Sequence, residues 1–236
     1  MGEDSALIWS ELILIKVFIN KLNDIRSVDI WTAYSDFMEI AAYTLKKPFE
    51  FVYKENIDDE FNNILKKYTD NEKEIFTNLL GIFINLMDEE ASRGKFTDIA
   101  GEIFNLLNIA NKQAGQFFTP QNLGYLTANV MDKNNIKKII DEQGYMTLNE
   151  PACGAGSMIL GMATLLLELG YNPQKKLLIK AVDIDRRCVD MCFTQLGYYG
   201  LPAVVIHGDT LSRKEWKKQY TPIYILDLWY LKRSNL

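Results

Sequence analysis

The chain has 236 residues, enough for one or two domains with a sizeable core. Hydrophobic residues make up 48% of it, which is ordinary for a globular protein and too much for a disordered one. No apolar run is long enough to span a membrane, and acidic Glu3 and Asp4 precede the apolar-rich residues 6–19, unlike the start of a secretory signal. We therefore expect a cytoplasmic protein without a membrane partner.

The cysteines and the single histidine limit metal and disulfide chemistry. Three cysteines, an odd number, argue against a disulfide framework. Cys188 and Cys192 lie one helical turn apart, Cys153 is distant in sequence, and His207 is the only histidine. Because a structural zinc usually takes four Cys or His ligands, we expect no metal site and small buried thiols instead.

The net charge of −5 is unevenly distributed. Residues 1–112 carry 12 basic and 20 acidic side chains, whereas residues 113–236 carry 14 basic and 11 acidic ones. A locally basic half can approach phosphates even in an acidic chain. The hydrophobic pattern changes at about the same point, so we expect a helical N-terminal domain over 1–112 and a second domain over 113–236.

The first 112 residues have helical periodicity. Apolar side chains step by three and four along two stripes: Trp31, Tyr34, Met38, Ala41 and Leu45, then Ile75, Leu79, Phe83 and Leu86. Pro48 is expected to end the first helix, and Asp70 to cap the second. Weaker helical patterns cover 5–22, 57–68 and 97–107, and we interpret all of them as core packing.

Strands and helices alternate after residue 144. Short apolar runs predict strands at 145–148, 177–182, 203–206 and 223–226, with helices at 157–169 and 186–199. This alternation is typical of parallel β-α-β units with right-handed crossovers. We therefore expect an α/β fold with an open sheet of parallel strands.

A glycine-rich segment lies between the first predicted strand and its helix. It reads Asn-Glu-Pro-Ala-Cys-Gly-Ala-Gly-Ser from Asn149, so that Gly154 and Gly156 precede the helix. Glycines at this place let a ligand approach the backbone, and the helix N-terminus offers free N–H groups. Ile159 stands where a dinucleotide-binding pattern has its third glycine, so the segment alone is equally compatible with a tight turn.

Acidic residues follow the next two predicted strands. Asp183 stands where the second strand ends, with Asp185 two residues on, and Asp209 follows the third strand within Gly-Asp-Thr. A carboxylate at such a strand end can accept both ribose hydroxyls of a nucleoside. Asp185 can instead cap the following helix, and Asp209 alone would be interpreted as an Asx-turn.

A fourth segment, Gly115–Gln121, precedes the predicted sheet. It reads Gly-Gln-Phe-Phe-Thr-Pro-Gln, in which Thr119 and then Pro120 form an N-cap followed by a proline at the first helical position. By itself the segment predicts a well-capped helix over 120–131.

Together, these four segments resemble the adenine-N6 DNA methyltransferases, in particular the modification subunit of type I restriction systems. The family's Gly-x-Phe-x-Thr-Pro segment is matched by 115–120, and its Asp/Glu/Asn-Pro-Ala-Cys-Gly-x-Gly segment by 150–156. Its acidic strand end and its Gly-Asp-Thr-Leu segment are matched by Asp183 and by 208–211. The resemblance implies a Rossmann-like methyltransferase sheet, truncated in this chain, behind a helical domain.

The resemblance also implies S-adenosylmethionine as the cofactor and DNA as a partner, with a specificity or other subunit as a further partner. It assigns cofactor-binding roles to six residues: Thr119 and Glu150 at the methionine end, Gly154 and Gly156 where the cofactor lies against the backbone, Asp183 at the ribose and Asp209 at the adenine ring.

The family's catalytic motif, Asn/Asp-Pro-Pro-aromatic, has only a degenerate counterpart. The target base is flipped out of the duplex, its amine is held by the Asn/Asp side chain and a proline carbonyl, and the aromatic ring stacks on it. Here the strand predicted at 223–226 is followed by Asp227, Leu228, Trp229 and Tyr230. The resemblance makes Asp227, the Leu228 carbonyl and Tyr230 the base-handling groups, and the lack of both rigid prolines predicts impaired transfer.

Three functions stay open at this point. The first is an enzyme that methylates adenine N6 in DNA, and the second is a truncated, catalytically inactive homologue that binds cofactor, DNA or protein. A methyltransferase for small molecules or proteins is the third. The basic residues at 213–218 and 232–233 are expected either to touch phosphates or to form a solvated face.

Overall fold

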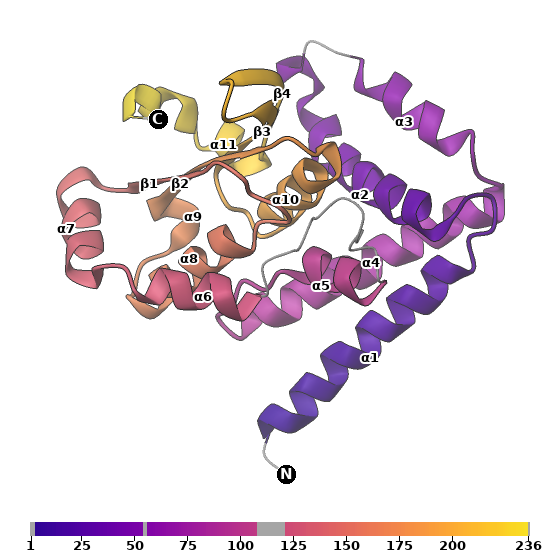
Figure 1. Ribbon diagram of the computed structural model, residues 1–236, viewed down its shortest axis with the longest axis horizontal. Coiled ribbons are helices and arrows are strands. Elements are labelled where there is room, and N and C mark those ends of the chain that lie inside the picture. The colour runs from indigo at the N-terminus through magenta and orange to yellow at the C-terminus, as the bar shows by residue number, and fades with distance from the viewer. Residues whose placement is uncertain (1–2, 54–55, 108–120, 236) are drawn as a thin grey trace.

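The structure is a computed structural model that describes the backbone of residues 3–53, 56–107 and 121–235. Helices make up the N-terminal part (Figure 1): α1 (Glu3–Asn23), α2 (Ile30–Lys46), the 3-10 helix η1 (Lys47–Val52), α3 (Ile57–Leu65), α4 (Asp70–Ser92) and α5 (Ile99–Leu106). The helical character predicted for this part of the chain is confirmed over the described residues.

Local chemistry sets the ends of these helices. Pro48 stands in the first turn of η1, so α2 ends at Lys46 and the chain continues as a tighter helix. The N-cap of α4 is Thr69, one residue before the predicted Asp70. Thr69 and Glu72 form a capping box, in which each side chain accepts the other's backbone N–H.

The C-terminal part alternates helices and strands: α6 (Gln121–Asn129), α7 (Lys133–Gln143), β1 (Met146–Glu150), α8 (Ser157–Glu168), α9 (Pro173–Lys176), β2 (Leu177–Asp183), α10 (Arg186–Tyr198), β3 (Ala203–Asp209), β4 (Lys214–Tyr220), α11 (Pro222–Leu226) and the 3-10 helix η2 (Trp229–Asn235). The sheet order is β1-β2-β3-β4, with the first three strands parallel. The first three predicted strands and the α/β class are confirmed.

The prediction of a fourth parallel strand at 223–226 is wrong. Those residues belong to α11, which begins at Pro222, a residue suited to the first turn of a helix. The fourth strand is β4, which pairs antiparallel with β3 and contains most of the basic run at 213–218. Charged side chains suit β4 because it lies at the edge of the sheet, where they discourage pairing with another strand.

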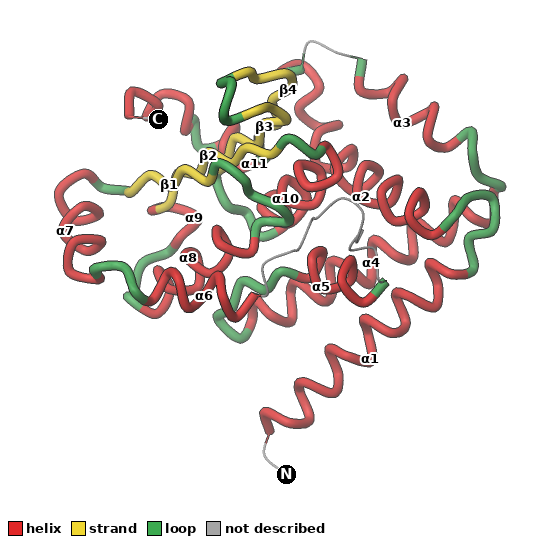
Figure 2. The backbone as a smooth tube through the Cα atoms, in the orientation of Figure 1, coloured by secondary structure: helices red, strands yellow, loops and turns green. Residues whose placement is uncertain are grey.

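The strands of the sheet, yellow in Figure 2, lie among helices, and apolar residues pack on both faces of the sheet. One face joins a large core with α8, α10 and the N-terminal helices through these residues: Leu177, Ile179, Ala181, Ala203 and Val205. The other face is covered by α11 and η2, through these residues: Leu178, Val182, Val204, Ile206, Tyr224 and Trp229. None of the helices in the described ranges is long and apolar enough to cross a membrane.

The buried side chain of Gln195, in α10, connects the N-terminal helices to the glycine-rich segment. Its amide nitrogen donates to Asp98 Oδ1 at the start of α5 and to the Ala155 carbonyl, both at 2.8 Å. Its oxygen accepts the backbone N–H of Ala100 at 3.0 Å. Because one core extends through both parts of the chain and residues 108–120 are outside the described ranges, the boundary at residue 112 stays a prediction.

Candidate cofactor site at the strand ends

The predicted site residues lie where the parallel strands end. β1 ends at Glu150, β2 at Asp183 and β3 at Asp209. In the sheet register Glu150 is opposite Ala181, and Asp183 is opposite His207. The carboxyl ends of parallel strands meet at one edge, which is where open α/β sheets bind ligands.

The glycine-rich loop between β1 and α8 needs its glycines for backbone conformation. Gly154 has φ 53° and Gly156 has φ 107°, both in the left-handed region that side chains disfavour. The Gly156 N–H donates to the Cys153 carbonyl at 2.8 Å, which closes the turn, and the Cys153 N–H donates to the Val182 carbonyl at 2.9 Å. The loop is thereby joined to the end of β2.

Asp183 makes a second connection between the loop and β2. Its Oδ2 accepts the backbone N–H of Gly154 at 2.8 Å, and its Oδ1 accepts the N–H of Asp185 at 2.9 Å. An ionised carboxylate offers about four acceptor positions, so about two remain for the hydroxyls of a ligand. Asp185 is the N-cap of α10, as the alternative interpretation of this residue predicted.

Glu150 and Asp209 are each engaged by their own loops. Glu150 Oε1 accepts the N–H of Ala152 at 3.2 Å, and burial raises the pKa of this half-buried carboxyl. Asp209 Oδ1 accepts the N–H groups of Leu211 at 2.9 Å and Ser212 at 3.3 Å, and a hydrogen bond from the Ser212 side chain lowers its pKa. Asp209 therefore forms an Asx-turn, and a cofactor role for it stays a prediction.

Cys153 lies in the glycine-rich loop, and Cys188 and Cys192 lie in α10, which packs against that loop. All three are free and buried, and a hydrogen bond between the thiols of Cys153 and Cys192 raises the pKa of Cys153 well above its usual range. A Cβ on Gly156 would lie 3.4 Å from Cys192 Sγ, so the loop packs closely on α10. No group of three or more possible metal ligands is found among the described residues.

The residues predicted to handle the base lie at the other end of the sheet. Asp227 is the C-cap of α11, and its Oδ2 accepts a hydrogen bond from Lys175 Nζ at 2.5 Å. Lys175 belongs to α9, just before β2 begins, whereas Asp183 ends β2. Seven residues of strand, each rising about 3.3 Å, put about 20 Å between the two ends.

The rest of that motif covers the second face of the sheet. Trp229 is fully buried, and its ring packs edge-on against Tyr145 with the centroids 5.5 Å apart. Lys232 Nζ lies 3.8 Å from the centroid of Trp229, while Leu228 and Tyr230 are about half exposed. The structure therefore does not bring Asp227, Leu228 and Tyr230 together with Asp183, because α11 replaces the strand expected to present them.

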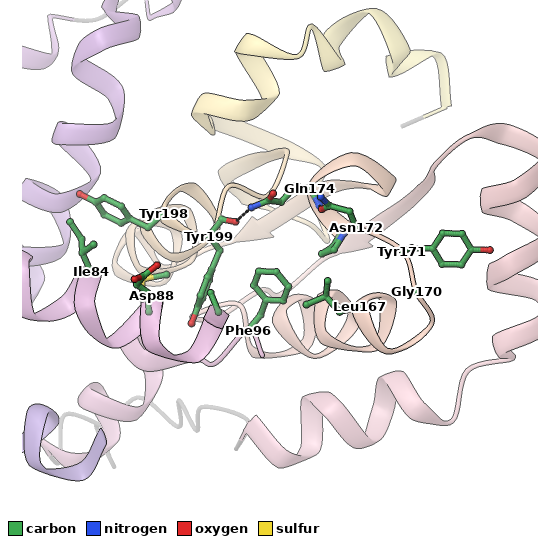
Figure 3. A pocket seen from close by; sticks show the side chains of 13 residues that line it. Ile84, Asp88, Phe96, Leu167, Gly170, Tyr171, Asn172, Gln174, Tyr198 and Tyr199 are labelled. Carbon is green, nitrogen blue, oxygen red and sulfur yellow. Dashed lines mark hydrogen bonds between the residues drawn. The ribbon is translucent and has the colours of Figure 1, made fainter. Parts of the chain in front are cut away.

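A cavity of about 610 Å³ lies between α4 and the segments that precede β2 and β3 (Figure 3). Asn172 and Gln174 line it just before β2, and Tyr198 and Tyr199 line it at the end of α10. It is therefore at the amino ends of the parallel strands and contains none of the predicted site residues.

Comparison with known proteins identifies the family. A model of the N-6 DNA methylase family matches residues 95–226, more than half of the chain. The chain belongs to the N-6 DNA methylase family. The match includes the glycine-rich loop, Asp183 and Asp209, and it ends directly before Asp227.

Two individual proteins are similar to this chain at low sequence identity. The type I restriction enzyme MpnII methylase subunit of Mycoplasma pneumoniae is 24% identical over 204 residues, which are 81% of this chain and 34% of that protein. The present chain thus spans about a third of the length of this relative. A solved putative class I S-adenosylmethionine-dependent methyltransferase from Listeria monocytogenes has a TM-score of 0.45 and 12% identity, with 92% of this chain and 68% of that chain covered.

The strand ends of this family member offer the groups that S-adenosylmethionine needs. Its ribose hydroxyls, adenine amine and ammonium group are donors, and the carboxylates of Glu150, Asp183 and Asp209 are acceptors. Its own carboxylate needs donors, and the first turn of α8 begins beside the loop. Ser157, in that turn, is only 5% exposed, and its hydroxyl has no hydrogen-bond partner among the described residues. A buried hydroxyl at a helix N-terminus can donate to the carboxylate of a ligand bound there.

Sequence reasoning missed Ser157 and Gln195. Ser157 directly follows the second glycine of the loop, so its place at the helix N-terminus was a usable signal. Gln195 had no such signal, because only the fold brings it to Ala155. Thr119, the remaining predicted cofactor residue, lies outside the described residues.

Proposed function

We propose that this protein binds S-adenosylmethionine at the carboxyl ends of β1, β2 and β3, and that it serves the N6-methylation of adenine in DNA. The hydrogen bond between the Gly154 N–H and Asp183 carries the proposal, because it joins two separately predicted cofactor motifs into one site. Membership of the N-6 DNA methylase family supports the reaction and the substrate.

Each residue of the site has a definite task in this proposal. Asp183 accepts the ribose hydroxyls, Asp209 accepts the adenine amine, and Glu150 and Thr119 hold the methionine end. Gly154 and Gly156 keep the loop free of side chains, so that a ligand can lie against the backbone. When bound, S-adenosylmethionine supplies an electrophilic methyl group.

The groups that hold the target adenine are a separate question. Asp227 is paired with Lys175 about 20 Å from Asp183, so we infer that Asp227, Leu228 and Tyr230 do not handle the base. Methyl transfer then depends on other residues or on another polypeptide. The relative in Mycoplasma pneumoniae is by name a subunit of a type I restriction enzyme, which favours a further subunit as partner.

The position of Asp227 also favours a second candidate function. A family member that keeps the cofactor end of the sheet and lacks base-handling groups would be a binding module without transfer activity. Transfer requires alignment to about an ångström, so a displacement of this size abolishes it.

Two measurements test these functions. Calorimetry with S-adenosylmethionine tests the site, and the proposal fails if the wild-type protein does not bind. Transfer of labelled methyl to DNA lacking adenine methylation, at low salt to preserve phosphate contacts, tests the reaction. Transfer by the chain, alone or with a candidate partner subunit, supports the methyltransferase. Cofactor binding without transfer in either case supports the binding module.

A further inference from the structure

The hairpin between β3 and β4 exposes apolar side chains to solvent. Leu211 is 96% exposed and Trp216 is 52% exposed. Large apolar side chains that stay exposed together commonly mark an interaction surface. We call Leu211, Arg213, Lys214 and Trp216 the hairpin surface.

Two contacts hold this hairpin against the edge of the sheet where the parallel strands end and where we place the cofactor site. The hydroxyl of Thr210 donates to the Pro151 carbonyl in the glycine-rich loop at 2.6 Å. His207 Nε2 is 3.2 Å from the Ile184 carbonyl, directly after Asp183. The ring of Trp216 meets the ring of His207 edge-on, with centroids 4.7 Å apart. The hairpin surface is therefore next to the proposed cofactor site.

The basic side chains at 213–218 in this hairpin differ in whether they form a salt bridge. Lys217 pairs with Glu60 of α3 at 2.7 Å, and Lys218 pairs with Glu215 at 2.6 Å. Arg213 and Lys214 are exposed, and neither forms a salt bridge with any residue in the described ranges. Lys214 stands opposite Asp209 in the β3–β4 register and interacts with its charge. Arg213 and Lys214 are nevertheless the most exposed cations of the run, and so the ones that an anionic partner reaches first.

We propose that the hairpin surface is where the protein contacts DNA, an inference that rests on the proposed function. Arg213 and Lys214 bind backbone phosphates, and the apolar side chains of Leu211 and Trp216 pack against the sugars between them. In a chain of net charge −5, two exposed cations beside the carboxyl ends of the parallel strands favour the approach of a polyanion there. The surface brings the duplex to the end of the sheet that holds the methyl donor.

Salt dependence of DNA binding tests the cations. Fluorescence anisotropy with a short labelled duplex gives the dissociation constant at several salt concentrations between about 50 and 200 mM. Because each phosphate contact contributes about 0.9 to the slope of log affinity against log salt, Arg213→Gln with Lys214→Gln reduces the slope by about 2. The matched control is Lys133→Gln with Lys137→Gln, two exposed lysines of α7 that form no salt bridge with a described residue, and these variants leave the slope unchanged.

A second pair of variants tests the aromatic contact. Trp216→Ala weakens binding by about tenfold, as expected for loss of roughly 60 Å² of apolar contact with the duplex backbone, whereas Trp216→Phe retains most of the affinity. Thermal melting checks the fold of each variant, since Trp216 also packs on His207. If Trp216→Ala does not fold, the cation variants still decide the proposal.

Three outcomes would overturn the proposal that the hairpin surface contacts DNA. The salt slope could stay unchanged in the Arg213 and Lys214 variant, the α7 control could lose as much slope, or the protein could prefer an RNA duplex of the same sequence. Titration with S-adenosylmethionine separates this proposal from the proposed function. A wild-type protein that binds the cofactor and not DNA refutes only the hairpin surface, whereas one that binds neither refutes both.

Discussion

The carboxylate of Asp183 accepts the backbone N–H of Gly154, with 2.8 Å between Oδ2 and N. The two residues are far apart in sequence, one ending β2 and the other in the turn before α8. Their hydrogen bond fixes the glycine-rich loop to the sheet before any ligand arrives. A site arranged in advance loses less freedom when it binds, which favours affinity.

We predict that Asp183→Ala lowers the affinity for S-adenosylmethionine at least tenfold. Hydrogen bonds to a charged acceptor contribute about 1.5–3 kcal/mol each, and 1.4 kcal/mol corresponds to a factor of ten. The loss also includes the support that Asp183 gives to Gly154. Isothermal titration calorimetry provides the measurement.

Asp185→Asn is the matched control for Asp183. Asp185 lies two residues further on, caps α10 and forms an ion pair with Arg187, so its replacement should leave cofactor affinity nearly unchanged. Equal binding by wild type and Asp183→Ala would show that Asp183 is not the ribose ligand.

We predict that Asp227→Ala changes neither cofactor affinity nor any methyl transfer that the protein shows. The ion pair of Asp227 with Lys175 is partly exposed, and such pairs contribute about 0–1 kcal/mol to stability. Lys175→Ala should therefore have the same small effect on thermal melting. A folded Asp227→Ala variant that loses transfer activity would contradict the position of this residue in the structure.

The sequence correctly predicted which residues lie at the carboxyl ends of the parallel strands, for a physical reason. Two of the motifs there follow runs of apolar residues, 177–182 and 203–206, that are buried on both faces and therefore easy to recognise. Once the strands are parallel, topology alone brings their carboxyl ends to one edge. The correct positions of Asp183 and Asp209 at strand ends follow from local patterns.

The other end of the sheet could not be predicted in this way. The apolar residues 223–226 indicate burial, and a short apolar run does not distinguish a strand from a turn of helix. β4 has no apolar run, because an edge strand needs few buried side chains. Lys175 and Asp227 are 52 residues apart, so their contact depends on packing between distant segments.

We predict that Glu72→Gln destabilises the protein and flattens the acid side of its stability profile. Glu72 is 6% exposed, and hydrogen bonds from the Ser27 hydroxyl and the N–H groups of Thr69 and Arg26 hold its pKa well below the usual range. Its contribution is therefore complete above the unfolded pKa of about 4.3 and decreases as the pH falls below that value. Denaturant unfolding at neutral pH should show a loss of about 1–3 kcal/mol.

The control for Glu72 is Glu74→Gln in the same turn of α4. Glu74 is exposed, and changes at such surface positions are usually within about 0.5 kcal/mol. If both variants lose the same stability between neutral and acid pH, the hydrogen bonds to Glu72 are not the cause of the pH dependence.

Two glycines, Gly124 and Gly161, bring α6 and α8 into backbone contact. A Cβ on Gly161 would lie 2.6 Å from the carbonyl carbon of Gly124, closer than packed atoms allow. Gly161→Ala must therefore separate the helices, at a cost of about 1–3 kcal/mol. Because α6 directly follows Thr119 and Pro120 in the sequence, we also expect weaker cofactor binding.

Gly81→Ala is the control for this substitution, since it also replaces a helical glycine. Gly81 lies within α4, and a Cβ there would have no atom within 4 Å. Alanine at an open helical position restricts the unfolded chain and stabilises by about 0.4–1 kcal/mol. Thermal melting should thus move in opposite directions for the two variants. A Gly161→Ala protein that melts at or above the wild-type temperature would show that α6 and α8 do not pack through these glycines. The expectation of weaker cofactor binding in this variant would then fail as well.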